Sequence, residues 1–172
     1  DVLARVLDTL RRQSLPAQEW ELVLIDNASS NPVEPELINW HPFGRVVQEP
    51  RLGLTQARLR GIAESHGEVL VWVDDDNMLD PEYLSAAREA FRNNPRLGAA
   101  GGPSEPIYSA SPPRWFHEGL VPLGCRNHGD HALVMHWHNQ QPFYPPAAPI
   151  GAGLVIRRKA IDLWVDQLQH DP

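Results

Sequence analysis

Apolar positions along the chain follow two periodicities, and together they predict helices that alternate with buried strands. Leu3, Val6, Leu7 and Leu10 recur at helical spacing, so we expect an opening helix that ends near residues 14–16. Residues 21–26 then form an apolar run that a polar turn closes. Because this run does not alternate with polar residues, it is typical of a parallel strand covered on both faces.

The same alternation continues to about residue 100. A weaker strand at 45–48 precedes a helix at about 54–65, and 69–73 is the clearest buried strand. Pro81 should open the next helix, because its missing N–H costs nothing at the first helical position. With a further short element at 97–100, the order predicts an α/β fold with a mostly parallel sheet.

The pattern changes between residues 103 and 149, where prolines, aromatics and histidines replace regular periodicity. We interpret this stretch as an irregular insertion, which at such length is usually functional or mobile. A strand at 152–156 and a last helix that carries Ile161, Trp164, Val165 and Leu168 follow it. We therefore expect one domain over residues 1–172 with an insertion at 103–149.

Composition narrows the function classes. The 172 residues suit one domain, and 42% hydrophobic residues suit a folded globular one. The net charge of −7 argues against nucleic acid as a partner. Cys125 is the single cysteine, so a disulfide framework is excluded. No apolar run is long enough to span a bilayer, which indicates a cytoplasmic protein and leaves peripheral association with the inner membrane face open.

Acidic side chains follow two of the expected strands. Asp26 ends one strand, and Asp74, Asp75 and Asp76 follow another. In open α/β sheets, ligands bind beyond the carboxyl ends of strands, and adjacent carboxylates need a compensating charge. Asp74 and Asp76 could hold Mg²⁺ or Mn²⁺, which bind hard oxygen ligands and bridge to a diphosphate. The alternative is an Asp-rich turn before the helix at Pro81, although Asp80 already supplies a cap.

Three motifs in order carry a family resemblance: Leu24–Ser30, Gly53–Ile62 and Trp72–Asn77. In their order and spacing the chain resembles the family 2 glycosyltransferases of the GT-A fold, over about residues 2–103. The resemblance returns at Gly151–Arg158. It implies a Rossmann-like three-layer α/β/α sandwich and an inverting, metal-assisted transfer of a sugar from a nucleotide-diphosphate sugar, of the kind used in polysaccharide biosynthesis, to a glycan or lipid-linked acceptor.

The resemblance also implies roles for single residues. Asp26 would accept a hydrogen bond from the nucleotide base, Arg58 would lie near the base or diphosphate, and Asp75 would contact the ribose or sugar. The implied nucleotide-sugar site is Asp26, Asn27, Arg58, Asp74 and Asp75, and the implied metal ligands are Asp74 and Asp76. From the residues alone, Asp26 can equally be a turn stabiliser and Arg58 a solvated or structural ion-pair residue.

The chain departs from the family pattern in three places. The opening strand of the family is missing before Asp1, and Leu59 stands where the family often has Asn. The carboxylate that takes the acceptor proton is expected beyond Pro172, since Asp162 and Asp166 fit the outer face of the last helix and Asp171 is the only other late candidate. We therefore expect a fragment that binds donor and is inactive without its missing parts.

Residues of the insertion and the acidic motif also allow other interpretations. His128, His131, His136 and His138 raise the question of zinc, with Asp130 as the only nearby carboxylate. Four aromatics in the insertion are candidates for stacking on an acceptor sugar or lipid, or for anchoring the loop: Trp115, Phe116, Trp137 and Tyr144. The alternative functions are a silent carbohydrate-binding or scaffolding module and an Asp-nucleophile phosphatase, whose motif would need a hydroxyl residue at Met78.

Overall fold

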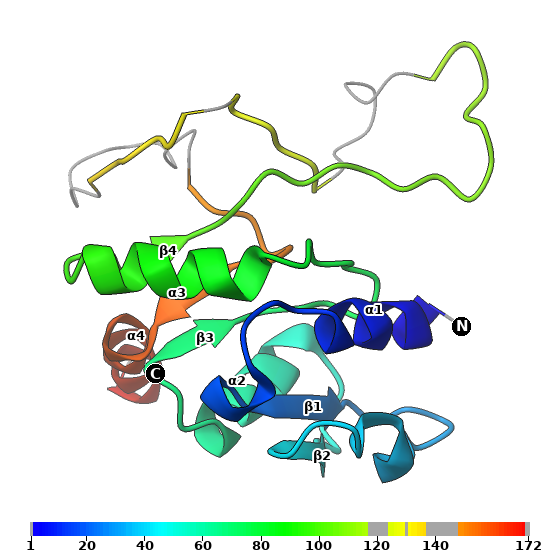
Figure 1. Cartoon of the computed structure of the whole chain (residues 1–172). Coiled ribbons are helices and arrows are strands. Elements are labelled where there is room, and N and C mark those ends of the chain that lie inside the picture. Colours follow the sequence, from blue (N-terminus) through cyan, green and yellow to red (C-terminus); the bar gives the residue numbers. More distant parts are fainter. Residues whose placement is uncertain (1, 117–123, 130, 137–147, 171–172) are drawn as a thin grey trace.

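The computed structural model describes residues 2–116, 124–129, 131–136 and 148–170, the last four as backbone only. Helices and strands alternate along the chain, as the periodicities predict (Figure 1). In chain order the elements are α1 (Val2–Arg11), η1 (Ala17–Glu19), β1 (Leu22–Asp26), η2 (Pro35–Ile38), β2 (Gly44–Gln48), α2 (Leu54–Glu64), β3 (Val69–Val71), α3 (Tyr83–Asn93), β4 (Ala99–Ala100), β5 (Val155–Arg157) and α4 (Arg158–His170).

The strands form two hydrogen-bonded groups. β1 pairs with β2 in parallel, so that Asp26 lies opposite Gln48 at the carboxyl ends of both strands. β5 lies between β3 and β4 and runs antiparallel to each, which means that β3 and β4 share one direction. The α/β prediction is confirmed. Among the described strands the pairing of β1 with β2 is parallel, and the two pairings made by β5 are antiparallel.

Two apolar clusters pack on opposite faces of the strands and give the three layers. The first joins α1, η2 and α3 to one face, through Val6, Leu7, Leu10, Leu15, Ile38, Leu79 and Leu84, with Leu22, Leu24, Val46 and Val71 packed against them. The second joins α2 and α4 to the other face, through Ile62, Leu70 and Ile161, with Leu59, Trp72 and Ile156 packed against them. Leu70 and Val71 face opposite ways because strand side chains alternate.

Some element ends differ from the predicted ones. α3 begins at Tyr83 instead of Pro81, because the carbonyl of Pro81 accepts a hydrogen bond of 2.8 Å from the N–H of Ser14. Asp80 does act at this helix start, since its Oδ1 accepts from the N–H of Glu82 at 2.9 Å. β3 ends at Val71 instead of residue 73, although the N–H of Trp72 still donates to the carbonyl of Leu154 at 2.8 Å.

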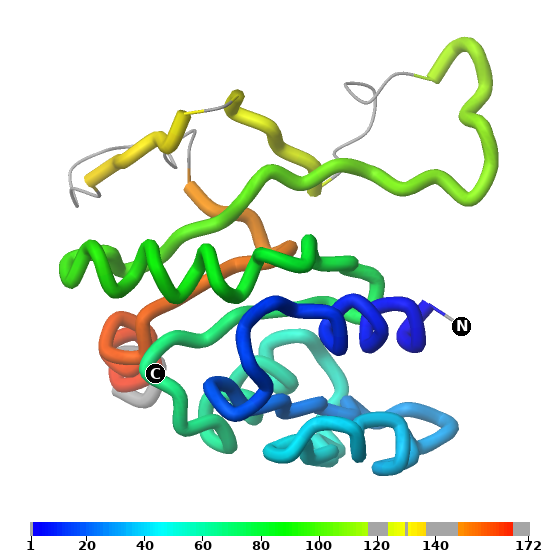
Figure 2. The backbone as a smooth tube through the Cα atoms, viewed as in Figure 1, coloured from blue at the N-terminus to red at the C-terminus, as the bar shows by residue number. Residues whose placement is uncertain are grey.

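The described residues between 103 and 149 form no helix or strand. One isolated bridge links Ser104 to Arg126. In the view of Figure 2 this segment runs along the side of α3 that is remote from β1 and β2. Within the part of the chain that the structure describes, no helix has the length and apolar character needed to cross a membrane.

Two consecutive arginines, the last residue of β5 and the first of α4, bind the carboxyl ends of two helices in different layers. Arg157 donates to the carbonyls of Phe91 and Asn94 at the end of α3, at 2.9 and 3.1 Å. Arg158 donates to the carbonyl of Ile62 in the last turn of α2 at 3.2 Å and to that of Gly67 at 2.8 Å. Cations are favourable at helix C-termini, where carbonyls lack intrahelical partners. The pair therefore fixes both helices to the same strand.

Replacing Arg158 with alanine should lower the free energy of unfolding by about 1–3 kcal/mol, because hydrogen bonds from a charged group to three acceptors are lost. The third acceptor is Ser65 Oγ, at 2.7 Å. Urea unfolding followed by circular dichroism measures the change. Arg5→Ala on the exposed side of α1 is the matched control and should change stability little; equal losses in both variants would contradict the capping role.

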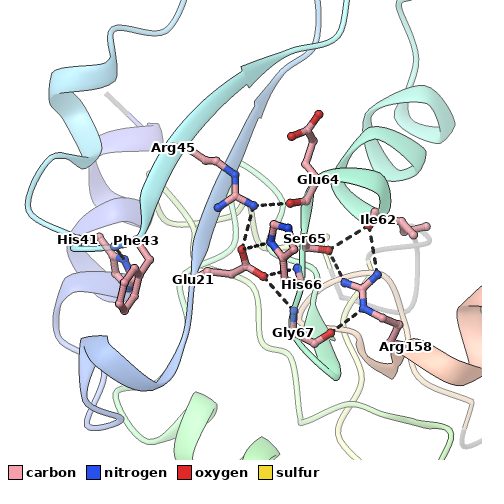
Figure 3. Close-up of polar contacts among 10 residues, drawn as sticks. All are labelled: Glu21, His41, Phe43, Arg45, Ile62, Glu64, Ser65, His66, Gly67 and Arg158. Carbon is pink, nitrogen blue, oxygen red and sulfur yellow. Dashed lines mark hydrogen bonds and ion pairs between the residues drawn. The ribbon is translucent and has the colours of Figure 1, made fainter.

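Glu21, just before β1, is the centre of a polar junction between β2 and the turn after α2 (Figure 3). Its carboxylate accepts from Arg45 Nη2 at 2.9 Å and from the backbone N–H groups of His66 and Gly67. Burial alone would raise the pKa of Glu21, but these hydrogen bonds outweigh it and lower the pKa from 4.5 to about 2. The junction therefore favours the ionised form strongly.

This lowered pKa gives stability a defined pH dependence. Because the folded-state pKa lies below the unfolded one, the contribution of Glu21 is full above pH 4.5 and is lost as pH falls towards about 2. Glu21→Gln should cost about 3 kcal/mol or less at pH 7 and progressively less as pH falls below 4.5. Urea unfolding of both proteins between pH 3 and 7 measures this; a pH-independent difference would contradict it.

Candidate functional site

Asp26, at the end of β1, holds the loop that follows it. The residue is 4% exposed, and its Oδ1 and Oδ2 accept from the N–H groups of Ser29 and Val33, each at 3.1 Å. Hydrogen bonding from Ser29 and Val33 lowers the pKa of Asp26 against the effect of burial. Asp26 is therefore an ionised turn stabiliser. Each oxygen of a carboxylate can accept a second hydrogen bond, so the predicted contact with a nucleotide base stays a prediction.

Asn27 joins three segments at the same edge of the sheet. Its Nδ2 donates to the carbonyls of Glu49 and Arg51 at 3.1 and 2.7 Å, and its Oδ1 accepts from the N–H of Gly53 at 2.8 Å. Gly53 directly precedes α2. The carboxamide thus fixes the exit of β1 to the exit of β2 and to the start of α2. The contact with the nucleotide sugar that the resemblance implies for Asn27 stays a prediction.

Glu49 is a site residue that the sequence analysis missed. It is 2% exposed, and its Oε1 accepts from both the backbone N–H and Nε of Arg51 at 2.9 Å. These hydrogen bonds lower the pKa of Glu49 and raise that of Arg51. An acidic residue directly after the strand run at 45–48 was the signal that could have found it.

A pocket of about 320 Å³ lies beyond the carboxyl ends of β1 and β2. Its lining residues come from the loops after the two strands: Asp26, Ala28, Ser29, Pro32, Gln48, Glu49 and Pro50. Ala28 has a φ of 54°, which is uncommon for a residue with a side chain. The volume falls at the lower end of the range for small-molecule pockets, at the sheet edge where α/β folds bind ligands.

The three aspartates after β3 lie in a tight turn, closed by a hydrogen bond of 3.0 Å from the N–H of Asn77 to the carbonyl of Asp74. Asp74 is half-buried and approaches Arg58, with 3.6 Å between Oδ1 and Nη2. Asp76 is exposed, and its Oδ1 accepts from Asn77 Nδ2 at 3.0 Å. Asp75 is exposed. Among the described residues, no group of three His, Cys, Asp or Glu side chains is arranged to hold a metal.

The oxygen ligands in this turn still fit a divalent cation that also binds phosphate. Mg²⁺ is commonly held by one or two carboxylates, and phosphate oxygens and waters complete its shell. Asp74 and Asp76 supply two carboxylates within one turn, and Asn77 Oδ1 beside them is a buried oxygen without a hydrogen-bond partner among the described residues. The turn therefore suits an ion that arrives with a phosphate ligand, and we expect it to bind a metal ion without that ligand only weakly.

Tyr83, the first residue of α3, draws two glycine stretches together. Its hydroxyl donates to the carbonyl of Gly153 and accepts from the N–H of Gly102 at 3.2 Å. A Cβ on Gly153, where φ is 68°, would lie 2.9 Å from the hydroxyl oxygen. Both glycine stretches thus approach the Tyr83 ring closely, and burial raises the pKa of Tyr83.

The insertion gives less support to a second site. His128, His131 and His136 belong to no metal-holding group among the described residues; His138, Asp130, Trp137 and Tyr144 lie outside them, as does Asp171. Trp115 is 69% exposed and has edge contact with Phe116, with ring centroids 6.4 Å apart. Asp162 and Asp166 are exposed on α4, as predicted.

Comparison with known proteins decides the family. The model of the family described as "Glycosyl transferase family 2" matches residues 1–161. The chain belongs to this family. Its membership favours the transferase interpretation over the Asp-nucleophile phosphatase. A curated relative, the glucosyl-dolichyl phosphate glucuronosyltransferase of Haloferax volcanii, is 32% identical over 82 residues, which are 46% of this chain and 26% of that protein.

Solved structures agree on the GT-A fold. Residues 1–349 of S. aureus TarS superpose with a TM-score of 0.57 at 19% identity, covering 66% of this chain and 35% of that TarS chain. The mannosyltransferase PcManGT of Pyrobaculum calidifontis, in complex with GDP-Man and Mn²⁺, gives a TM-score of 0.54 at 23% identity, covering 60% of this chain and 32% of PcManGT. The chain thus spans about a quarter to a third of the length of these relatives.

Asn27→Ala should lower the free energy of unfolding by about 1–3 kcal/mol, because it leaves the Gly53 N–H and two carbonyls without their partner. Hydrogen exchange should also speed up at the start of α2 more than at its end. Urea unfolding and amide exchange measure the two effects. Asn31→Ala, in the exposed part of the same loop, is the control. Unchanged exchange at residues 53–57 would contradict the linking role of Asn27.

Proposed function

We propose that this chain holds a nucleotide-diphosphate sugar at the edge of the sheet, and that the protein transfers the sugar, with inversion and metal assistance, to a glycan or lipid-linked acceptor. The observation that carries the proposal is the way α2 connects the two acidic loops. Its start is bound to Asn27 beside the pocket, and Arg58 in its second turn approaches Asp74. A ligand with a base at one end and a diphosphate at the other fits this arrangement.

Three residues of the predicted site, Asp26, Arg58 and Asp75, then contact the nucleotide sugar. The base lies in the pocket beside Asp26, within reach of the lone pairs that Ser29 and Val33 leave free. Arg58 contacts the diphosphate, because a guanidinium matches phosphate geometry. Asp75 contacts the ribose or the sugar. Structures of TarS with UDP-GlcNAc and of PcManGT with GDP-Man support a sugar donor of this class.

Asp74 and Asp76 would hold Mg²⁺ or Mn²⁺. When bound, the ion stabilises the negative charge that develops on the departing diphosphate. The mannosyltransferase complex with Mn²⁺ supports this choice of metal. The carboxylate that takes the acceptor proton belongs, in this proposal, to a segment outside residues 1–172, since Asp162 and Asp166 are exposed on α4. The described residues of the insertion lie on the acceptor side, and the protein works in the cytoplasm or at the inner membrane face.

Calorimetric titration with UDP and with GDP, with and without Mn²⁺, tests the proposal. We expect binding of one nucleotide that Mn²⁺ strengthens. Asp76→Ala should weaken that binding by about tenfold or more, as expected for the loss of a metal ligand. Asp162→Ala, an exposed aspartate on α4, is the matched control and should bind as the unmodified chain does.

Three outcomes separate the candidates. Nucleotide affinity that neither Mn²⁺ nor Asp76→Ala changes contradicts the metal assignment. Binding of a glycan without any nucleotide binding supports the silent carbohydrate-binding module instead. Phosphate release from simple phosphomonoesters would support the phosphatase.

A further inference from the structure

The guanidinium of Arg58 is held on three sides. Its Cζ lies 5.7 Å from the centre of the Trp72 ring, a cation–π distance. Its Nη2 lies 3.6 Å from Asp74 Oδ1. On the remaining side, a Cβ added at Gly151 would come within 3.1 Å of Nη2. The head group therefore fits a narrow space that the missing side chain of Gly151 leaves open.

Gly61 supports this arrangement from the same helix. Arg58 and Gly61 are three residues apart on α2, so they share one face. A Cβ on Gly61 would lie 3.2 Å from Trp72 Cζ3. The absence of that Cβ lets Trp72 pack closely against α2, where its ring reaches the Arg58 head group.

The N–H groups of Arg58 nevertheless have poor hydrogen-bond partners among the described residues. Its Nε is buried and has no hydrogen-bond partner in the part of the chain that the structure describes, and the contact with Asp74 is longer than a hydrogen bond. The side chains of Arg58 and Asp74 are 29% and 38% exposed, and ion pairs with such exposure contribute little. Little free energy is needed to separate Arg58 from Asp74, and the guanidinium has N–H groups available. It can therefore form stronger hydrogen bonds with another anion.

We propose that Arg58 is the resident counter-cation of Asp74 and is exchanged when the donor binds: the metal takes Asp74, and Arg58 turns to the diphosphate. The inference rests on the proposed function and adds a coupling between metal binding and nucleotide binding. Arg58 competes with a metal ion that binds alone, because both are cations directed at one carboxylate. It favours a metal ion that arrives with a nucleoside diphosphate, because the diphosphate offers the guanidinium a new partner. Trp72 and Gly151 are the positioning residues.

The coupling predicts opposite changes for two ligands in one variant. In the full chain, Arg58→Ala should bind Mn²⁺ alone about two- to fivefold more tightly, since a weak competing ion pair is gone. The same variant should bind UDP or GDP in saturating Mn²⁺ about tenfold or more weakly, since charge-assisted hydrogen bonds to phosphate are lost. Mn²⁺ electron paramagnetic resonance and calorimetry measure the two affinities.

Three further variants control the result. Arg58→Lys keeps the charge, so its affinity for Mn²⁺ alone should stay closer to that of the unmodified chain. Arg60→Ala removes a neighbouring arginine that pairs with Glu64 at 2.9 Å, and should change neither affinity. Gly151→Ala keeps the arginine at position 58 but displaces its guanidinium from Asp74. This variant should bind Mn²⁺ alone more tightly than the unmodified chain, by a smaller factor than Arg58→Ala does. Circular dichroism verifies that each variant folds.

The outcomes distinguish this inference from the proposed function. If Arg58→Ala binds Mn²⁺ as the unmodified chain does or more weakly, or if neither binds Mn²⁺ at all, the counter-cation role is overturned. If the unmodified chain binds Mn²⁺ but neither nucleotide, the proposed function fails, and the exchange to a diphosphate fails with it. Tighter Mn²⁺ binding together with weaker nucleotide binding supports the exchange.

Discussion

The anchoring of α2 at both ends is the constraint on which the geometry of the site depends. Asn27 accepts from the N–H of Gly53 at the start of the helix, and Arg158 donates to the carbonyl of Ile62 near its end. Arg45 adds a second contact at the carbonyl of Glu64. A helix fixed at both ends cannot slide along the sheet, so Arg58 in its second turn keeps its position against Asp74. The site is therefore set by hydrogen bonds at the helix ends.

The negative charges of the chain separate into two kinds by how well they are satisfied. Asp26, Glu21 and Glu49 are buried or nearly so, and backbone N–H groups or arginines satisfy each of them and lower their pKa values. Among the described residues, Asp74 has only a loose pair with Arg58, and Asp76 has only the hydrogen bond from the Asn77 amide. The first kind holds loops in place. The carboxylates of the second kind can bind a cation that carries a phosphate ligand. Without such a cation, the net charge of −7 would oppose the binding of an anion.

Much of the fold could be predicted from the periodicities, because burial on one or two faces imposes them. The direction of β5 could not, because in a mixed sheet a short strand covered on both faces is apolar throughout whichever way it runs. The start of α3 depended on Ser14, which is distant in sequence from Pro81. At the site, the position of Asp26 after a strand was evident, whereas its bonds to Ser29 and Val33 depended on the path of the loop. The pairing of Arg58 with Asp74 depended on how α2 packs, which no local pattern encodes.

Leu59 shows how the chain can depart from its family without disturbing the site. The family often has Asn at this position, and a buried Asn needs hydrogen-bond partners. Leu59 instead packs with Ile62, Leu70 and Ile161 in the second core cluster, on the face of α2 that meets α4 and the sheet. Arg58 and Gly61 occupy the neighbouring face, which meets Trp72 and Gly151. Leu59 and Arg58 lie on different faces of α2, and Trp72 packs against the core cluster that includes Leu59 as well as against the Arg58 head group. An apolar residue at 59 therefore adds to the core on which the Trp72 ring lies, and it leaves the contacts of Arg58 intact.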